Sequence, residues 1–246
     1  MCTVTYIPSR HGCFLTSSRD ENIKRPTAAA PAICRINDMD LIYPKDTKAN
    51  GSWIACTQAG NAAVLLNGGF EKHIPSPPYR KSRGLVFLDI ISSTQPLHYF
   101  ASADLEKIEP FTLVLFIAGQ LFETRWDGIQ KHTIQLDENI PHIWSSVTLY
   151  TTEIIEKRRS WFREWIKNSA VASARSILNF HRFAGDGDTT NSIRMNRDNE
   201  MLTVSITSID IRPDAATMEH FDLKENKHSI QSLVPETVLE QPKLLC

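Results

Sequence analysis

The residue best equipped for chemistry is Cys2, which directly follows the initiator methionine. Removal of Met1 would leave a thiol and a free α-amine on the same residue. Their reference pKa values, about 8.5 for the thiol and about 7.7–8.0 for the amine, would give that residue a nucleophile and its own base. A free cysteine is also a common small buried residue, so Cys2 taken alone leaves a core role open.

The residues after Cys2 predict a β-hairpin. Residues 3–7 and 13–17 are rich in β-branched and aromatic side chains, and a short glycine-containing connection separates them. If Ile7, the last residue of the first run, pairs with Cys13, the first residue of the second run, Cys2 lies opposite Ser18. The hairpin therefore brings the polar segment that begins at Ser18 back to the start of the chain.

That polar segment offers groups that could assist a cysteine. A cation at Arg19 would favour the thiolate of a nearby cysteine or bind a carboxylate. A carboxylate at Asp20 would hold an ammonium group or orient a proton acceptor. The alternative interpretation is a solvated, charged end of a strand, and only the expected proximity to Cys2 favours the chemical one.

Several ordered segments of the chain match one protein family. They are Met1–Thr3, Ser18–Glu21, Arg25–Pro26, Pro44–Asp46, Asn50–Ala55, Leu65–Gly68, Pro77–Gly84, Arg125–Gly128 and His142–Ser146. By these segments the chain resembles the NRDE family, which includes the transport and Golgi organisation 2 proteins, and most closely its bacterial members. The resemblance covers roughly residues 1–167 and is weaker beyond them.

The resemblance implies a fold and a set of site residues. The family is similar in fold to the choloylglycine-type N-terminal nucleophile amidases, so it implies an α+β fold arranged as a four-layer αββα sandwich. Cys2, Asp20 and Asn67 match the amidase pattern, which implies catalytic roles for them. Asn67 also precedes a glycine, and an Asn-Gly pair is a common turn signal, so a simple turn is the alternative for this residue.

Two positions depart from the family pattern. Ser18 replaces the asparagine of the signature, and Ser146 stands where many relatives have an asparagine that helps to handle the substrate carbonyl in the amidases. A serine donates one hydrogen bond and reaches less far. One oxyanion donor contributes about 2.7–4 kcal/mol in known enzymes, so the change weakens the case for efficient amide hydrolysis. The predicted substrate-binding residues are Arg19, Ser18 and Ser146.

Composition fits one globular domain over residues 1–227, followed by a polar, proline-punctuated tail over residues 228–246. A net charge of −1 gives no bias toward nucleic acid, and no apolar run is long enough to span a membrane. The five cysteines form no CxxC pair and no zinc pattern, which favours reduced thiols, no metal site and a cytoplasmic location.

Residue patterns predict the remaining elements. The predicted strands are residues 53–56, 62–66, 111–116, 120–125, 132–136, 192–195, 201–211 and 218–223. The predicted helices are residues 82–91, a short helix capped by Ser102 or Asp104 that runs to Ile108, residues 152–167 and residues 170–180. Pairing Cys56 with Ala62 makes residues 53–66 a second hairpin.

Two functions remain open from the sequence. In the first, the protein is a cysteine-type N-terminal nucleophile hydrolase that cleaves a linear amide or acyl C–N bond with Cys2 and requires no cofactor. In the second, the same fold binds or carries haem or a lipid or acyl ligand without catalysis, as the resemblance implies for eukaryotic relatives. Cys2 or a nearby histidine would then be the axial haem ligand. The sequence leaves the substrate and the oligomeric state undefined.

Overall fold

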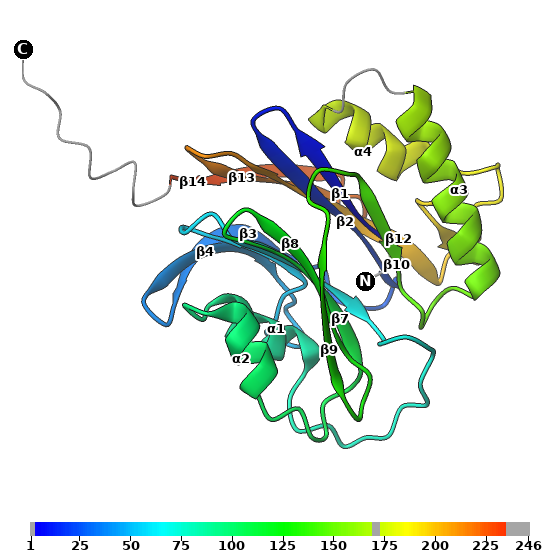
Figure 1. Cartoon of the computed structure of the whole chain (residues 1–246). Coiled ribbons are helices and arrows are strands. Elements are labelled where there is room, and N and C mark those ends of the chain that lie inside the picture. The colour runs from blue at the N-terminus through cyan, green and yellow to red at the C-terminus, as the bar shows by residue number, and fades with distance from the viewer. Residues whose placement is uncertain (1–2, 169–172, 235–246) are drawn as a thin grey trace, which may run out of the picture.

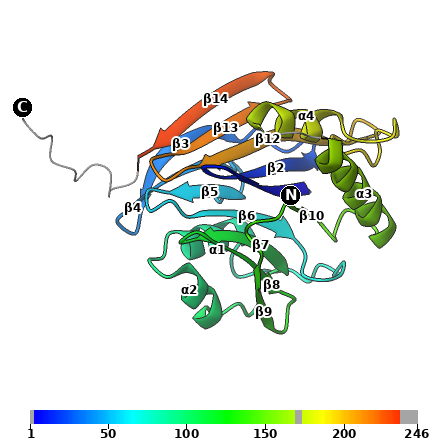
Figure 2. The same ribbon diagram turned by 45° about the horizontal axis from the view of Figure 1, so that its top comes forward.

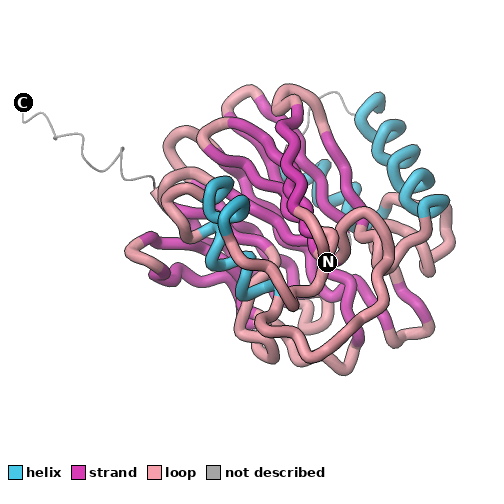
Figure 3. The backbone as a smooth tube through the Cα atoms, turned by 60° about the horizontal axis from the view of Figure 1, so that its bottom comes forward, coloured by secondary structure: helices cyan, strands magenta, loops and turns pink. Residues whose placement is uncertain are grey.

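Two antiparallel β-sheets stack face to face, and helices cover the outer face of each sheet (Figures 1 and 2). The structure is a computed structural model that describes residues 3–168 and 173–234. Figure 3 shows the helices on two outer sides with the strands between them. This is the predicted αββα sandwich. In the described residues no helix has both the length and the apolar character needed to cross a membrane.

The first sheet, sheet A, has the strand order β10-β1-β2-β12-β13-β14, with β11 paired to β12. The chain therefore places its first hairpin at the centre of this sheet and closes the sheet with strands from its C-terminal third. The strands are β1 (Thr3–Ser9), β2 (Gly12–Asn22), β10 (His142–Ser145), β11 (Asn196–Arg197), β12 (Met201–Ile211), β13 (Ala216–Asp222) and β14 (Lys227–Leu233).

The second sheet, sheet B, is a meander in which each strand pairs with the next along the chain. Its strands are β3 (Ala29–Ile36), β4 (Met39–Lys45), β5 (Ile54–Thr57), β6 (Ala62–Asn67), β7 (Phe111–Ile117), β8 (Gln120–Trp126) and β9 (Lys131–Leu136). The predicted pairing of Cys56 with Ala62 is confirmed. The sequence pattern located β5 to β9, whereas β3 and β4 were not among the predicted strands.

The helices form the two outer layers. They are α1 (Arg83–Ile91), α2 (Pro96–Ser102), α3 (Thr152–Asn168) and α4 (Ala174–Phe183). Helices α1 and α2 cover sheet B, whereas α3 and α4 cover sheet A (Figure 2). The predicted helix that runs to Ile108 is wrong. The helix lies earlier, because Pro96 supplies a favourable first helical residue, and the Asp104 carboxylate instead accepts the Glu106 N–H in a turn.

Three apolar clusters hold these layers together in the described residues, and two of them are large. The larger core fills the space between the sheets and extends under α1, with Val4, Ile54 and Phe87 fully buried in it. The smaller core joins sheet A to α3 and α4 through Phe14, Phe162 and neighbouring side chains. Burial of a large apolar side chain contributes about 1.5–3 kcal/mol, so both layers are firmly attached.

The hairpin at the start of the chain has a register one residue away from the predicted one. Ile7 pairs with Phe14, not with Cys13, and Thr3 pairs with Ser18. The strands continue to Ser9 and Gly12, so the turn has two residues, whereas the prediction assumed a longer connection. The length of the turn fixes the register of a hairpin, so this difference shifts every pair by one.

The C-terminal boundary also differs from the sequence prediction. Residues 227–233 form β14, which pairs along its whole length with β13. Leu233 is buried in the larger core, so the folded domain continues past residue 228. The remaining part of the predicted tail, residues 235–246, lies outside the described residues.

Candidate active site

The four segments that carry the predicted site residues meet at the start of β1. Thr3 pairs with Ser18 on one side and with the last residue of β10 on the other. The next residue after β10 is Ser146, whose hydroxyl donates to the backbone carbonyl of Asn67 over 2.9 Å. Cys2 precedes Thr3 and lies outside the described residues.

The side chains of β2 alternate between the two faces of sheet A and so divide the predicted residues. Ser18 and Asp20 face the helical layer, whereas Arg19 faces sheet B. The structure thus brings Arg19 and Asn67 to one cleft between the sheets. It places the side chains of Ser18 and Asp20 on the outer face of sheet A.

The Ser18 hydroxyl lies 2.8 Å from Nδ1 of His181, a residue of α4, and the other ring nitrogen of His181 lies 2.9 Å from the Thr5 hydroxyl. His181 is completely buried. Burial and the nearby charge of Arg158 lower the pKa of His181 to about 3. This neutral imidazole therefore links α4 to both strands of the first hairpin. The predicted role of Ser18 in substrate binding stays a prediction.

Asp20 belongs to a buried polar cluster on the same face. Its carboxylate accepts hydrogen bonds from the Tyr150 hydroxyl at 2.6 Å and from the Thr203 hydroxyl at 2.5 Å. The guanidinium carbon of Arg158 lies 3.6 Å from the centre of the Tyr150 ring, and Arg158 also donates to the Thr3 hydroxyl. Two hydroxyl donors fix the orientation of the Asp20 carboxylate, and a buried cation anchors the start of β1.

Arg19 lies in an ion-paired cluster on the inner face. Its Nη2 atom is 2.8 Å from the Asp46 carboxylate, and its guanidinium carbon is 4.6 Å from the centre of the Trp53 ring. Burial lowers the pKa of Arg19, although the charges of Glu21 and Asp46 oppose that shift. A guanidinium group nevertheless remains protonated in proteins. The cation predicted at this position is thus present, and its principal partner is a carboxylate of the protein.

Asp46 balances two arginines. Arg25 donates from Nε to the same carboxylate oxygen as Arg19, over 2.9 Å. Burial alone would raise the pKa of Asp46, but hydrogen bonds from Arg25 and from the Ala49 N–H, with the charge of Arg19, bring it below its ordinary value. Asp46 therefore stays ionised at neutral pH. Sequence reasoning gave it no role, although it lies in one of the segments that match the family.

The cleft beside Arg19 has a volume of about 500 Å³, which lies within the range of small-molecule sites. Its walls combine polar and aromatic groups from both sheets and from the start of α1. Among the described residues, the side-chain amide of Asn67 makes no hydrogen bond, so its N–H groups are available to a ligand. The lining includes Arg19, Arg25, Asp46, Trp53, Asn67, Tyr79, Arg83 and Glu109.

Ser146 positions Asn67 through its hydroxyl group. Its single proton goes to the Asn67 carbonyl, and its oxygen also contacts the Thr148 hydroxyl at 2.9 Å. In this arrangement Ser146 has no second proton to donate to a substrate carbonyl. The predicted role of Ser146 in substrate binding stays a prediction, and its observed contact is with the backbone of a neighbouring candidate residue.

Sequence reasoning missed the residues that support this site from the helical layer. His181, Arg158 and Tyr150 come from segments more than 120 residues away from the first hairpin, and no local motif marks them. The histidines of the chain are scattered, so their spacing carried no signal. In the described residues no three His, Cys, Asp or Glu side chains gather closely enough to hold a metal ion.

Comparisons with known proteins agree with this architecture. A family model described as transport and Golgi organisation 2 matches residues 1–224. Among solved structures, the Caenorhabditis elegans N-acylethanolamine-hydrolyzing acid amidase ortholog is similar, with a TM-score of 0.61 and 10% sequence identity over 85% of this chain and 92% of that chain. At this identity the similarity shows a shared fold.

A second solved structure is a C2A mutant of the conjugated bile acid hydrolase from Clostridium perfringens. It has a TM-score of 0.47 and 7% identity and covers 94% of this chain and 96% of that chain. No curated protein sequence matches the chain significantly. The fold of the chain is therefore that of the N-terminal nucleophile hydrolases, and the comparisons leave its chemistry open.

Proposed function

The chain belongs to the transport and Golgi organisation 2 family, and we propose that it is a cysteine-type N-terminal nucleophile hydrolase that cleaves a linear amide or acyl C–N bond. One observation carries the proposal. The start of β1, immediately after Cys2 in the sequence, pairs with the end of β10, and the next residue, Ser146, binds the backbone of the cleft-lining Asn67. A nucleophile at the N-terminus of that strand would have an amide donor within the same site.

In the proposed reaction, removal of Met1 frees the α-amine of Cys2. The thiol attacks the substrate carbonyl and its proton passes to the α-amine, which gives a tetrahedral intermediate. The Asn67 amide donates a hydrogen bond to the resulting oxyanion. The C–N bond then breaks, the leaving amine takes the proton from the α-ammonium, and a thioester remains on Cys2. Water attacks this thioester and releases the acid and the free thiol.

The remaining candidate residues have supporting roles in this proposal. We assign Asp20 to orient the α-amine, because two hydroxyl donors hold its carboxylate in one orientation. We assign Arg19 to the electrostatics of the cleft together with Asp46, because their ion pair leaves little uncompensated charge for a substrate carboxylate. Ser146 positions Asn67 by binding its backbone carbonyl.

A second candidate function uses the same cleft for binding an acyl or lipid ligand without turnover. The observation in its favour is that the hydroxyls of Ser18 and Ser146 both bind protein groups, so neither acts as a second oxyanion donor. Haem fits the cleft less well. No histidine is among the described residues that line it, and the charged groups in its walls have ion-pair partners in the protein.

Intact-mass analysis combined with thiol labelling tests the hydrolase proposal. We expect the purified protein to lack Met1 and a neutral-pH alkylating reagent to modify Cys2 selectively. Burial raises the pKa of both Cys13 and Cys56 to about 12, so their thiols should react slowly. A panel of N-acyl amides and activated acyl esters would then show turnover.

Two variants make this test specific. Cys2→Ala should abolish turnover with little effect on folding, whereas Cys34→Ala, at a partly exposed thiol on β3, should leave turnover unchanged. Retention of Met1, or equal turnover by Cys2→Ala, would exclude the proposed mechanism. Saturable binding of an acyl ligand without turnover would favour the second candidate function.

A further inference from the structure

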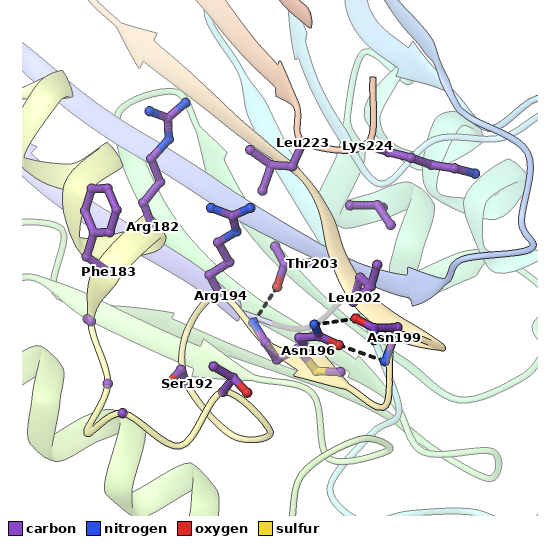
Figure 4. A pocket seen from close by; sticks show the side chains of 16 residues that line it. Arg182, Phe183, Ser192, Arg194, Asn196, Asn199, Leu202, Thr203, Leu223 and Lys224 are labelled. Carbon is purple, nitrogen blue, oxygen red and sulfur yellow. Dashed lines mark hydrogen bonds between the residues drawn. The ribbon is translucent and has the colours of Figure 1, made fainter. Parts of the chain in front are cut away.

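A pocket separate from the candidate cleft lies on the outer face of sheet A, at the end of α4. It has a volume of about 530 Å³, the size of a small-molecule site. We call it the α4 pocket. Its walls come from the end of α4, the loop that follows, the β11–β12 hairpin and the turn after β13 (Figure 4). Sheet A separates it from the cleft that Arg19 and Asn67 line.

The α4 pocket has cationic groups and no carboxylate in its described lining. Arg182 comes from α4, and Arg194 comes from the segment just before β11 (Figure 4). Neither forms an ion pair with any described residue, whereas every arginine in the lining of the cleft has a carboxylate partner. Two arginines with no acidic partner make the pocket electropositive, which favours an anionic ligand.

The Arg182 guanidinium provides a second and independent observation. Its Nε–H is buried and has no hydrogen-bond partner among the described residues. Its guanidinium carbon lies 4.8 Å from the centre of the Phe221 ring, which supports the flat group from one side. Buried donors nearly always find an acceptor in folded proteins, so Arg182 has hydrogen-bonding capacity that no described residue uses.

The neighbouring polar groups are already engaged with one another. The amide of Asn196 exchanges hydrogen bonds with Asn199 at 2.8 and 2.9 Å (Figure 4). The Lys224 ammonium binds the backbone carbonyls of two residues that follow β2, so only its stem lines the pocket. Among the charged groups of the described lining, Arg182 and Arg194 therefore remain for a ligand.

Carboxylates of the nearby loop do not neutralise this charge. Asp186 pairs with Lys157 on α3, and Asp188 accepts hydrogen bonds from Thr190 and Asn191 within its own loop. Neither aspartate is among the residues that line the pocket. The positive charge of the two arginines thus remains uncompensated at the pocket.

Apolar side chains form the rest of the wall. Leu202 and Leu223 line the pocket, and Phe183 stands at it with 73% of its surface exposed. An exposed aromatic residue beside two unpaired arginines suits a ligand that has an oxyanion at one end and an apolar group at the other. From these features we propose that the α4 pocket binds a small organic anion, a carboxylate or a phosphate ester, through Arg182 and Arg194.

Calorimetric titration with phenyl phosphate and with phenylacetate tests this proposal, because the two probes share an aromatic group and differ in the oxyanion. The titrations use the full chain and, in parallel, its Cys2→Ala variant. The site does not depend on the proposed hydrolase function, so binding should be equal in both proteins. Binding of one probe alone would identify the headgroup class, and binding of both would show that the site accepts either.

Arginine variants locate the binding. Arg194→Gln should weaken the affinity by at least about tenfold, or about 1.4 kcal/mol, since it removes a hydrogen bond to a charged group. It should leave the melting temperature unchanged, because Arg194 is exposed and makes no hydrogen bond to a described residue. Arg182→Gln should weaken binding to a similar extent. The control is Arg159→Gln, at an exposed arginine paired with Glu156, and it should bind normally.

Two results would overturn the proposal. One is the absence of binding of either probe at millimolar concentration. The other is binding that is unchanged in Arg194→Gln and Arg182→Gln, which would place the ligand elsewhere on the protein.

Discussion

Asn67 is held in place through its backbone, which leaves its side chain available. The Ser146 hydroxyl binds its carbonyl oxygen, and the next residue, Gly68, has a φ of +89°. A Cβ atom at Gly68 would come within 2.6 Å of the Val147 side chain, so the turn after β6 requires glycine for both its conformation and its space. Asn67 is itself the last residue of β6, where it pairs with Phe111, and it lines the cleft, so it is a strand residue and the chain leaves the sheet only at Gly68.

The proposed role of Asn67 predicts a selective kinetic effect. Asn67→Ala should slow acylation of the protein by an activated acyl ester by about 10²–10³-fold, the usual effect of removing one oxyanion donor. Alkylation of Cys2 by iodoacetamide should continue at nearly the same rate, because displacement of iodide forms no oxyanion. Mass spectrometry over time measures both reactions. Equal slowing of the two reactions would indicate a general loss of thiol reactivity and exclude the proposed role.

Helix α4 is joined to the first hairpin through a single buried imidazole. Both ring nitrogens of His181 bind hydroxyls, those of Thr5 on β1 and Ser18 on β2. The pKa of His181 is lowered to about 3 by burial and by the charge of Arg158, whereas an unfolded histidine titrates near pH 6.5. The unfolded chain therefore takes up a proton at a higher pH than the folded protein does.

This difference predicts how stability depends on pH. The contribution of neutral His181 is fully present above about pH 6.5 and is lost as the pH falls toward 3, with a slope of up to about 1.4 kcal/mol per pH unit. His181→Gln, which retains groups able to bind both hydroxyls, should reduce this slope in urea unfolding between pH 7 and pH 4. His220→Gln is the comparison variant. Burial also lowers the pKa of His220, to about 4, so the slope of its unfolding free energy against pH can be set beside that of His181→Gln. An unchanged slope in His181→Gln would contradict the assignment.

Local sequence patterns predicted the helices and strands whose formation depends on nearby residues. They failed for elements whose formation depends on contacts distant in the sequence. The β5–β6 hairpin and helix α1 follow from alternation, a glycine turn and apolar spacing within a few residues. Strand β14 was predicted as tail because its sequence is polar and alternates weakly. It is an edge strand with exposed side chains, and its hydrogen bonds to β13 and the burial of Leu233 supply the missing stabilisation.

The same distinction applies to the candidate site. Cys2 and Asp20 were identified from their chemistry and from the predicted hairpin, whereas the role of Asn67 came from the family resemblance. The partners of Ser18 and Asp20 could not be predicted, because α3, α4 and β12 reach them only after the whole sandwich has assembled. A one-residue change in register would exchange the faces of Arg19 and Asp20, which local pattern alone does not exclude.

At the scale of the whole molecule, the two sheets are joined at the cleft by a charge cluster as well as by the apolar core. Arg19 belongs to sheet A, whereas Asp46 follows β4 of sheet B, and their side chains are 6% and 12% exposed. Asp46 also accepts the N–H groups of Lys48 and Ala49 through its other carboxylate oxygen. One carboxylate therefore fixes a loop of sheet B, neutralises Arg25 and connects the two sheets.

Loss of the Asp46 charge should therefore weaken the whole sandwich. Asp46→Asn keeps an oxygen for the two loop N–H groups but leaves Arg19 and Arg25 only the more distant carboxylate of Glu21, 3.5 Å from each. The free energy of unfolding should fall by about 3 kcal/mol, the lower end of the cost of breaking a buried ion pair. Arg19→Met should cost less, because Asp46 would still pair with Arg25. Asp210→Asn, which breaks the more exposed pair with Arg212, should change stability by less than about 0.5 kcal/mol.

The stabilisation by Asp46 should change with pH in a defined direction. The folded-state pKa of Asp46 lies below its ordinary value of about 3.9, so the stabilisation is fully present above that pH and is lost as the pH falls through the folded-state pKa. Urea unfolding should thus separate Asp46→Asn from the natural chain clearly at pH 7 and progressively less below about pH 3.9. An equal difference at pH 7 and at pH 2 would show that the asparagine acts through packing, and the ion pair would then not be what joins the sheets at the cleft.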